Sequence, residues 1–83
     1  MYFVYFLRLD NDDIYIWSTN NLRRRLFEHN NHLVLSTKFS SIIKLLAYIV
    51  VPSEKRARNL EKYFKTGSGK AILKKRILTD EAI

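Results

Sequence analysis

The sequence contains no cysteine and no long apolar run. The first absence excludes disulfides, thiolate metal sites and cysteine nucleophiles, and it agrees with a cytosolic protein. The longest apolar stretch, residues 45–51, is too short to cross a bilayer. Met1 leads directly into an apolar segment without the basic residues that open a signal peptide. We therefore expect a cytoplasmic protein with no membrane partner.

Acidic residues are also scarce, since 8 Asp and Glu stand against 15 Lys and Arg and leave a formal net charge of +7 over 83 residues. Such a balance favours a polyanionic partner, with nucleic acid ahead of an acidic membrane surface. The simpler alternative is a soluble basic protein without such a partner. The charge is clustered, however, at Arg23–Arg25 and again over residues 62–76. The length fits a single domain over residues 1–83, and no repeat or linker interrupts it.

The residue pattern predicts three strands and three helices. Segments rich in aromatic and branched side chains predict strands over residues 2–9, 14–17 and 42–51, the first two joined as a hairpin. Amphipathic segments predict helices over residues 21–30, 53–66 and 68–78. The expected fold is therefore α+β, with a three-stranded antiparallel sheet flanked by three helices in the order β-β-α-β-α-α. Because residues 42–51 are largely apolar, we expect that strand to be well covered.

Polar residues and glycines predict the ends of the helices. Asn20 is the expected N-cap of the first helix, and Ser53 is the expected N-cap of the second. Gly67 is expected to end the second helix, and Ser68 to cap the third.

One carboxylate interrupts the apolar stripe of the second helix. Ala57, Leu60, Glu61 and Phe64 share one face at helical spacing. An ionised carboxylate is costly to desolvate unless a cation or hydrogen-bond donors meet it. Glu61 is therefore either at the edge of the stripe, paired with a lysine or arginine, or a metal ligand.

Only one arginine of the first helix is expected to point toward the body of the domain. The leucines of this helix define the buried side, and Arg25 and His29, four residues apart, border that side. Arg24 and Glu28 are expected to point into solvent, where Arg24 is free to meet phosphates. The alternative is a snorkelling arginine beside a hydrogen-bonded core histidine.

Two tyrosines lie on the two strands of the hairpin, and their relative orientation depends on the register. A three-residue turn over residues 11–13 sets Leu9 opposite Tyr15 and places Tyr5, Tyr15 and Trp17 on one face. A two-residue turn separates the tyrosines. Both alternatives are open, and core tyrosines with bonded hydroxyls are the default.

Taken together, these segments resemble the GIY-YIG nuclease superfamily, and most closely its small stand-alone bacterial members. The matching segments follow one another in order over nearly the whole chain: Phe3-Val4-Tyr5, Tyr15-Ile16-Trp17, residues 19–26, Glu28-His29-Asn30, Ser36-Thr37-Lys38, Lys44-Leu45, the helix holding Ala57 and Glu61, and residues 65–70. A match to several motifs at once is far more specific than a match to one.

The resemblance implies a fold, an activity and a site. Members of this family have a three-stranded sheet flanked by helices and hydrolyse DNA phosphodiester bonds with one divalent metal, Mg²⁺ or Mn²⁺. It implies that Tyr5 and Tyr15 flank the attacking water, one of them as general base. It also implies that Arg25 steadies the scissile phosphate, His29 assists and Glu61 holds the metal.

The partner implied by the resemblance and the charge is DNA. We expect basic side chains around the site to contact its phosphates: Arg23, Arg24, Lys38, Lys62, Lys65 and Lys70. No small-molecule cofactor is expected, and a protein partner or a homodimer is an open alternative.

The sequence departs from the family pattern at two glycines. Phe3 replaces the leading glycine of the first triplet, which is common among the small members. Trp17 replaces the glycine of the second triplet, where glycine often marks a close approach to the backbone. The indole blocks the phosphate or the metal water, packs against a helix, or stacks on a nucleobase as an extra contact.

The sequence leaves three competing hypotheses for the function. The first is a metal-dependent DNA endonuclease acting in DNA repair or restriction-like processing, and the second is a catalytically impaired nucleic-acid-binding module on the same fold. The third is a small basic RNA- or ribosome-binding protein, which requires the two tyrosines to lie on opposite faces of the sheet.

Overall fold

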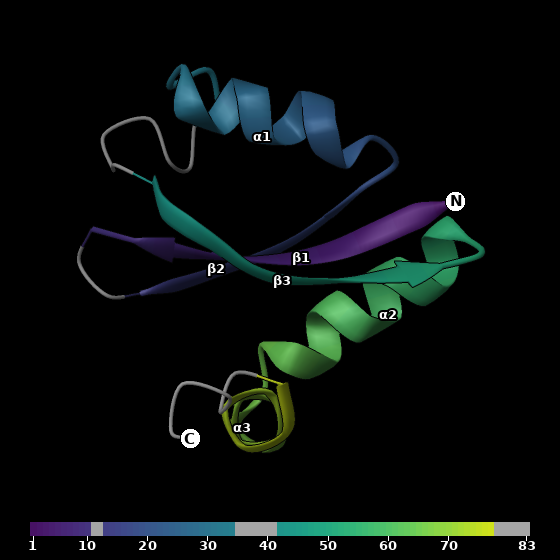
Figure 1. Cartoon of the computed structure of the whole chain (residues 1–83). Coiled ribbons are helices and arrows are strands. Elements are labelled where there is room, and N and C mark those ends of the chain that lie inside the picture. Colours follow the sequence, from purple (N-terminus) through teal and green to yellow (C-terminus); the bar gives the residue numbers. More distant parts are fainter. Residues whose placement is uncertain (11–12, 35–41, 78–83) are drawn as a thin grey trace.

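The structure is a computed structural model that describes residues 1–10, 13–34 and 42–77 (Figure 1). The strands are β1 (Tyr2–Leu9), β2 (Ile14–Thr19) and β3 (Ile42–Val51). The helices are α1 (Leu22–Asn30), α2 (Glu54–Phe64) and α3 (Gly67–Ile72), and a π-helical turn over Leu73–Ile77 continues α3. The α+β order predicted from the sequence is confirmed. Lys38 and the predicted end of the last helix at Leu78 lie outside the described residues.

The sheet is antiparallel in the order β2-β1-β3, so β1 is its central strand. Tyr5 lies opposite Trp17, and Leu7 lies opposite Tyr15. Directly opposed residues point to the same face, so both tyrosines and Trp17 share one face, as the three-residue turn predicts. The predicted pairing of Leu9 with Tyr15 is wrong, because the Leu9 amide donates to the Asp13 carbonyl at 2.9 Å and the turn begins one residue earlier.

The helices cover both faces of the sheet, with α1 on one face and α2 and α3 on the other (Figure 1). A cluster of buried apolar side chains fills the space beneath α2 and α3: Val4, Phe6, Ile16, Ala57, Phe64 and Leu73. On the α1 face, Tyr5, Leu7 and His29 have no exposed surface. The alternation of β1 between these faces makes it buried along most of its length.

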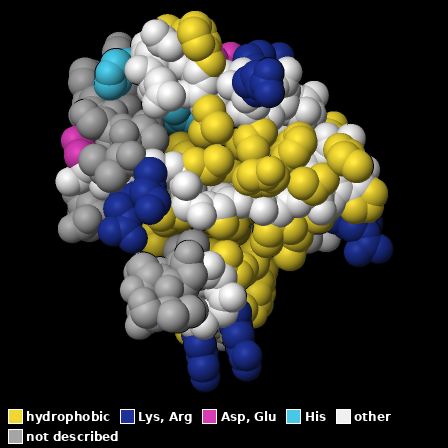
Figure 2. All heavy atoms as spheres, viewed as in Figure 1, with side chains coloured by type: hydrophobic (Ala, Val, Ile, Leu, Met, Phe, Trp, Pro, Cys, Tyr) yellow, Lys and Arg dark blue, Asp and Glu magenta, His cyan; other side chains and the backbone are white. Residues whose placement is uncertain are grey.

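The third strand is covered less than its composition predicts. Tyr48 is 51% exposed and Val50 is 44% exposed. Both lie opposite β1 residues of the α1 face, Tyr5 and Phe3 respectively. In Figure 2 hydrophobic side chains form a band across the middle of the view. An apolar strand is covered only where a helix reaches it, and α1 leaves this part of its face open.

Three of the predicted helix ends are wrong, because Asn20 and Ser68 are not N-caps and Gly67 does not end α2; Ser68 lies inside α3. The N-cap of α1 is Asn21, whose side chain accepts from the Arg24 amide at 3.0 Å, and not Asn20. Ser53 caps α2 as predicted. Lys65 ends α2, and Thr66 caps α3 by accepting from the Gly69 amide at 3.0 Å, so Gly67 begins a helix where it was expected to end one.

Candidate active site

A tyrosine–histidine pair lies between the sheet and α1. The Tyr5 hydroxyl and His29 Nε2 are 2.9 Å apart, and neither residue has exposed surface. The Tyr15 ring packs edge-on to the His29 ring at 5.1 Å between centroids and lies 6.3 Å from the Tyr5 ring. Three of the predicted site residues are therefore in one cluster.

Burial keeps this pair uncharged at neutral pH. Desolvation raises the pKa of the Tyr5 phenol well above its ordinary value. Burial, and then the charge of Arg25, lowers the pKa of His29. The phenol therefore keeps its proton, and the imidazole is neutral.

Arg25 connects the pair to the surface of α1. Its guanidinium interacts with Tyr5 and opposes the effect of burial on the pKa of that phenol, and Nη1 donates to Glu28 Oε1 at 3.0 Å. The expectation that Glu28 points into solvent is wrong, because it lies one helical turn from Arg25 and is held by it. Arg24 does point outward, with a side chain that is 59% exposed.

Glu61 lies at the edge of the apolar stripe of α2 and has two partners. Oε1 accepts from Ser18 Oγ at 2.8 Å, and Oε2 accepts from Lys65 Nζ at 3.1 Å. The Glu61 side chain is only 14% exposed. Pairing with a lysine is thus confirmed, and the Ser18 hydroxyl compensates the other oxygen for lost water.

A basic hollow at the end of β2 is lined by residues from both faces of the sheet. It measures about 250 Å³, and its lining includes Ser18, Arg24, Arg25 and Arg58. Ser18 faces α2 and Arg25 lies on α1, so the residue that holds Glu61 and the predicted phosphate ligand open onto the same space. Sequence reasoning missed Ser18 and Arg58. The signal for Ser18 was its position directly after Trp17, because strand alternation turns it to the opposite face.

Trp17 lies at the surface beside this cluster. Its indole is 40% exposed and stacks on the Tyr15 ring at 6.1 Å between centroids and 23° between planes. Lys65 Nζ lies 4.1 Å from the centroid of the indole ring. The same ammonium therefore contacts both Trp17 and Glu61.

Comparison with known families agrees with this arrangement. The family model of the GIY-YIG catalytic domain matches residues 1–76. The chain belongs to the GIY-YIG superfamily. No curated protein and no solved structure gives a significant match. Among the described residues, no helix is long and apolar enough to cross a membrane.

The GIY-YIG assignment bears on the function together with the observation that Tyr5 and Tyr15 share one face of the sheet. The family has a nuclease fold, and the family suggests DNA as the substrate. The RNA- or ribosome-binding alternative required Tyr5 and Tyr15 on opposite faces of the sheet, and the strand register puts them on one face. The predicted phosphate contacts in the described part of the chain are all exposed, at Arg23, Arg24, Lys62, Lys65 and Lys70.

The donors near Glu61 fit the divalent metal that GIY-YIG nucleases use. In residues 1–10, 13–34 and 42–77 no group of three or more His, Asp or Glu side chains forms a metal cage. One carboxylate and the Ser18 hydroxyl are hard oxygen donors, and Mg²⁺ is commonly held by one or two carboxylates, substrate phosphate and water. Glu61 would hold the metal, and the Lys65 ammonium would have to leave Oε2.

The buried imidazole predicts that acid destabilises the fold. In the unfolded chain His29 takes up a proton below about pH 6.5, whereas the folded protein resists it because its pKa is lowered. The unfolded state then binds more protons, so stability falls as the pH falls below this value. The facing groups are Arg25, Glu28, Tyr5 and Tyr15.

We expect the thermal midpoint of the wild type to fall by several degrees between about pH 7.5 and about pH 5. His29→Gln should flatten this profile. His32→Gln is the matched control, because His32 is the other histidine and is exposed, and it should keep the wild-type profile. Equal acid sensitivity in His29→Gln and the wild type would contradict the assignment of the acid destabilisation to His29.

Proposed function

We propose that this GIY-YIG protein is a metal-dependent DNA endonuclease that hydrolyses phosphodiester bonds. One observation carries the proposal. Arg25 interacts with Tyr5 of the buried Tyr5–His29 pair and lines a basic hollow whose wall, at Ser18, holds the Glu61 carboxylate. Phosphodiester hydrolysis needs a deprotonated water, compensation of charge on the phosphoryl oxygens and help for the leaving oxygen. This set of groups can supply all three.

The residues divide these tasks according to their access to solvent. We assign the attacking water to Tyr15, because it is half-buried and reaches solvent, while Tyr5 is fully covered. Tyr5 and His29 act behind it as positioning residues, since they fix Arg25 and the Tyr15 ring. Arg25 binds the phosphate, because its planar guanidinium donates in pairs to two oxygens. Glu61 would hold a divalent metal, which would supply polarisation of the phosphoryl group and stabilisation of the leaving oxygen.

Hydrolysis then proceeds without a covalent enzyme intermediate. Tyr15 acts as the general base: its oxygen takes a proton from the water, and the resulting hydroxide attacks phosphorus. The phosphorus bond to the leaving oxygen breaks, and that oxygen takes a proton from solvent. Arg25 compensates the charge that develops on the phosphoryl oxygens.

A second function is favoured by one contact. Lys65 pairs with Glu61 Oε2 and lies over the Trp17 ring, so a cation already occupies the proposed metal ligand. This contact favours a catalytically impaired protein that only binds nucleic acid. The Lys65 side chain is 41% exposed, however, and an ion pair of that exposure contributes little stability. A divalent ion can therefore displace it.

The test is cleavage of supercoiled plasmid and of flap and nicked duplexes in Mg²⁺ or Mn²⁺. We expect cleavage by the wild type, loss in a chelator, and a loss of at least about 100-fold in Glu61→Gln, because a catalytic metal contributes several kcal/mol. An inert wild type beside an active Trp17→Gly variant would establish the impaired alternative. Binding without cleavage by both proteins would refute the endonuclease.

A further inference from the structure

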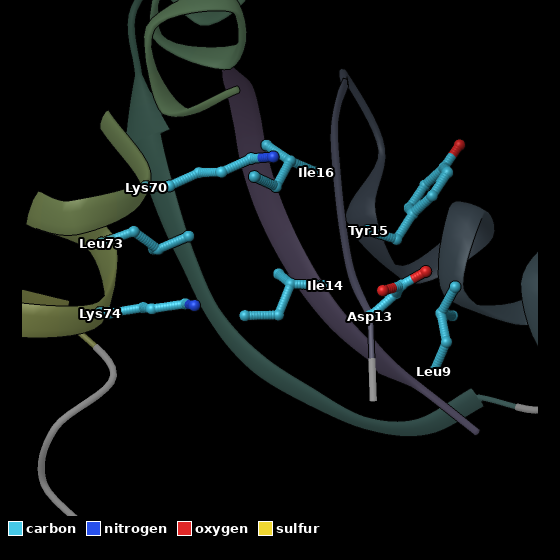
Figure 3. A pocket seen from close by; sticks show the side chains of 8 residues that line it. All are labelled: Leu9, Asp13, Ile14, Tyr15, Ile16, Lys70, Leu73 and Lys74. Carbon is cyan, nitrogen blue, oxygen red and sulfur yellow. The ribbon is translucent and has the colours of Figure 1, made fainter. Parts of the chain in front are cut away.

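A second hollow runs over the outer edge of β2 and shares only Tyr15 with the catalytic arrangement described above. It measures about 470 Å³ and lies between β2 and the end of α3 (Figure 3). Its lining combines aliphatic, aromatic and charged side chains: Leu9, Asp13, Ile14, Tyr15, Ile16, Lys70, Leu73 and Lys74. We call this hollow the edge groove.

One bank of the edge groove is cationic. Lys70 and Lys74 are four residues apart, and in Figure 3 both side chains extend toward β2 over the apolar surface of Ile14 and Ile16. Both lysines are exposed, and neither forms an ion pair with a described residue. Asp13 is the acidic residue in the lining, and it lies across β2 from them. The α3 bank is therefore free to bind phosphate oxygens.

The other bank is aromatic. Tyr15 lines the groove from the α1 side of β2, and the exposed indole of Trp17, which lies outside the lining, stacks on the Tyr15 ring. Lys65 reaches over this indole from α2. The edge of the domain thus presents two stacked rings along one strand, with a row of lysines on the neighbouring helices.

We propose that the edge groove binds an unpaired DNA strand, with its phosphates along Lys70 and Lys74 and a base stacked on Trp17 in the place of the Lys65 ammonium. Aromatic platforms beside a cationic channel bind single strands because every base has a stacking face. The base faces of a duplex are occupied by its own neighbours, so a duplex can reach the lysines but not the indole. Trp17 is then a specificity-determining residue in the position of the family glycine.

This inference deepens the proposed function and rests on it for the choice of DNA. The edge groove includes Tyr15, the proposed base, so an unpaired strand bound there lies beside the catalytic cluster. A nuclease with this arrangement selects branched, flapped or frayed DNA over uniform duplex.

The test uses Trp17 as its own reporter, because it is the only tryptophan in the chain. Its fluorescence is followed in chelator, where no cleavage takes place. The titrants are a single-stranded oligonucleotide, the same sequence as a duplex, and an abasic strand of equal length. We expect the single strand to quench the indole and bind more tightly, while the duplex and the abasic strand quench it little at saturation.

Variants separate stacking from charge. Trp17→Leu should weaken single-strand binding by about 5- to 150-fold, the range for loss of one stacked base, and should change duplex binding little. Lys74→Gln should reduce the dependence of log K on log salt by about 0.7, as for one single-strand phosphate contact. Lys75→Gln is its matched control, an exposed neighbour outside the groove lining that should keep the wild-type slope.

Equal binding of single strand and duplex, or unchanged single-strand affinity in Trp17→Leu, would overturn the inference. Circular dichroism establishes that each variant is folded before its affinity is compared. Cleavage is measured separately in Mg²⁺, so an active nuclease without single-strand preference refutes the groove alone. An inactive protein that prefers single strands refutes the endonuclease alone.

Discussion

Arg25→Lys is expected to reduce the single-turnover cleavage rate by about 10²- to 10³-fold, the effect of losing one preorganised donor to a developing oxyanion. The guanidinium interacts with Tyr5 and donates to Glu28 while it lines the basic hollow. A lysine ammonium carries the same charge, but it is a point donor without the planar fork and cannot hold these partners and a phosphate together. The loss should therefore appear in the rate more than in DNA affinity.

The neighbouring arginine provides the matched control. Arg24→Lys makes the same chemical change one position earlier, on a side chain that is 59% exposed. Its rate should stay within about threefold of the wild type, because the charge that attracts DNA is kept. Rates are measured on a labelled flap duplex, and affinity is measured in chelator. Equal losses in the two variants would show that the arginines act only as general cations.

Gly69→Ala is expected to lower the free energy of unfolding by about 1–3 kcal/mol or more, the range for forced overpacking. A Cβ at this position would lie 2.5 Å from the Tyr63 carbonyl carbon and 2.7 Å from Phe64 Cα, and closer still to the Tyr63 carbonyl oxygen. These are backbone atoms of the last turn of α2, so no side-chain rotation relieves the overlap. Relief requires α3 to move away or Phe64, which is 5% exposed, to leave the core.

Gly67→Ala is the matched control for this substitution. No atom lies within 4 Å of a Cβ at Gly67, which is the first residue of α3. Its stability should be unchanged or raised by up to about 1 kcal/mol, because alanine favours a helix over glycine. Thermal unfolding by circular dichroism measures both variants, and each kcal/mol corresponds to about 4–8 °C in a domain of this size. Similar midpoints for the two variants would contradict the close approach of α3 to α2.

The order of the elements could be predicted from the sequence because it depends on local periodicity. The caps could not be fixed, because Asn20 and Asn21 have the same chemistry and the choice depends on where β2 ends. The pairing of Glu61 with Lys65 was readable at i, i+4, whereas its bond to Ser18 joins residues 43 positions apart and exists only through the packing of α2 on β2. The covering of β3 likewise depends on how far α1 reaches, which no pattern within residues 42–51 encodes.

The candidate site was predicted as a set of residues but not as a geometry. Whether Tyr5 and Tyr15 share a face was open, because a one-residue difference in the turn reverses a strand. The sequence also did not show which of the two tyrosines is more exposed to solvent, since both are strand tyrosines in similar apolar surroundings. Tyr5 is covered because it lies on the central strand beneath His29, while Tyr15 lies on the edge strand.

The central position of β1 bears on the order in which the ribosome delivers the parts of the site. β1 precedes both of its neighbours in the chain, and its Tyr2 pairs with Val51 of β3. A growing chain can close the β1–β2 hairpin and α1 early, but a two-stranded hairpin alone is marginally stable. The second edge of β1 and the face that α2 covers can be packed only after later residues are synthesised. Closing the long loop between these parts has an entropic cost. The half that holds Arg25 is therefore synthesised well before Glu61, so a nascent chain that already contains the proposed phosphate ligand lacks the carboxylate proposed to hold the metal.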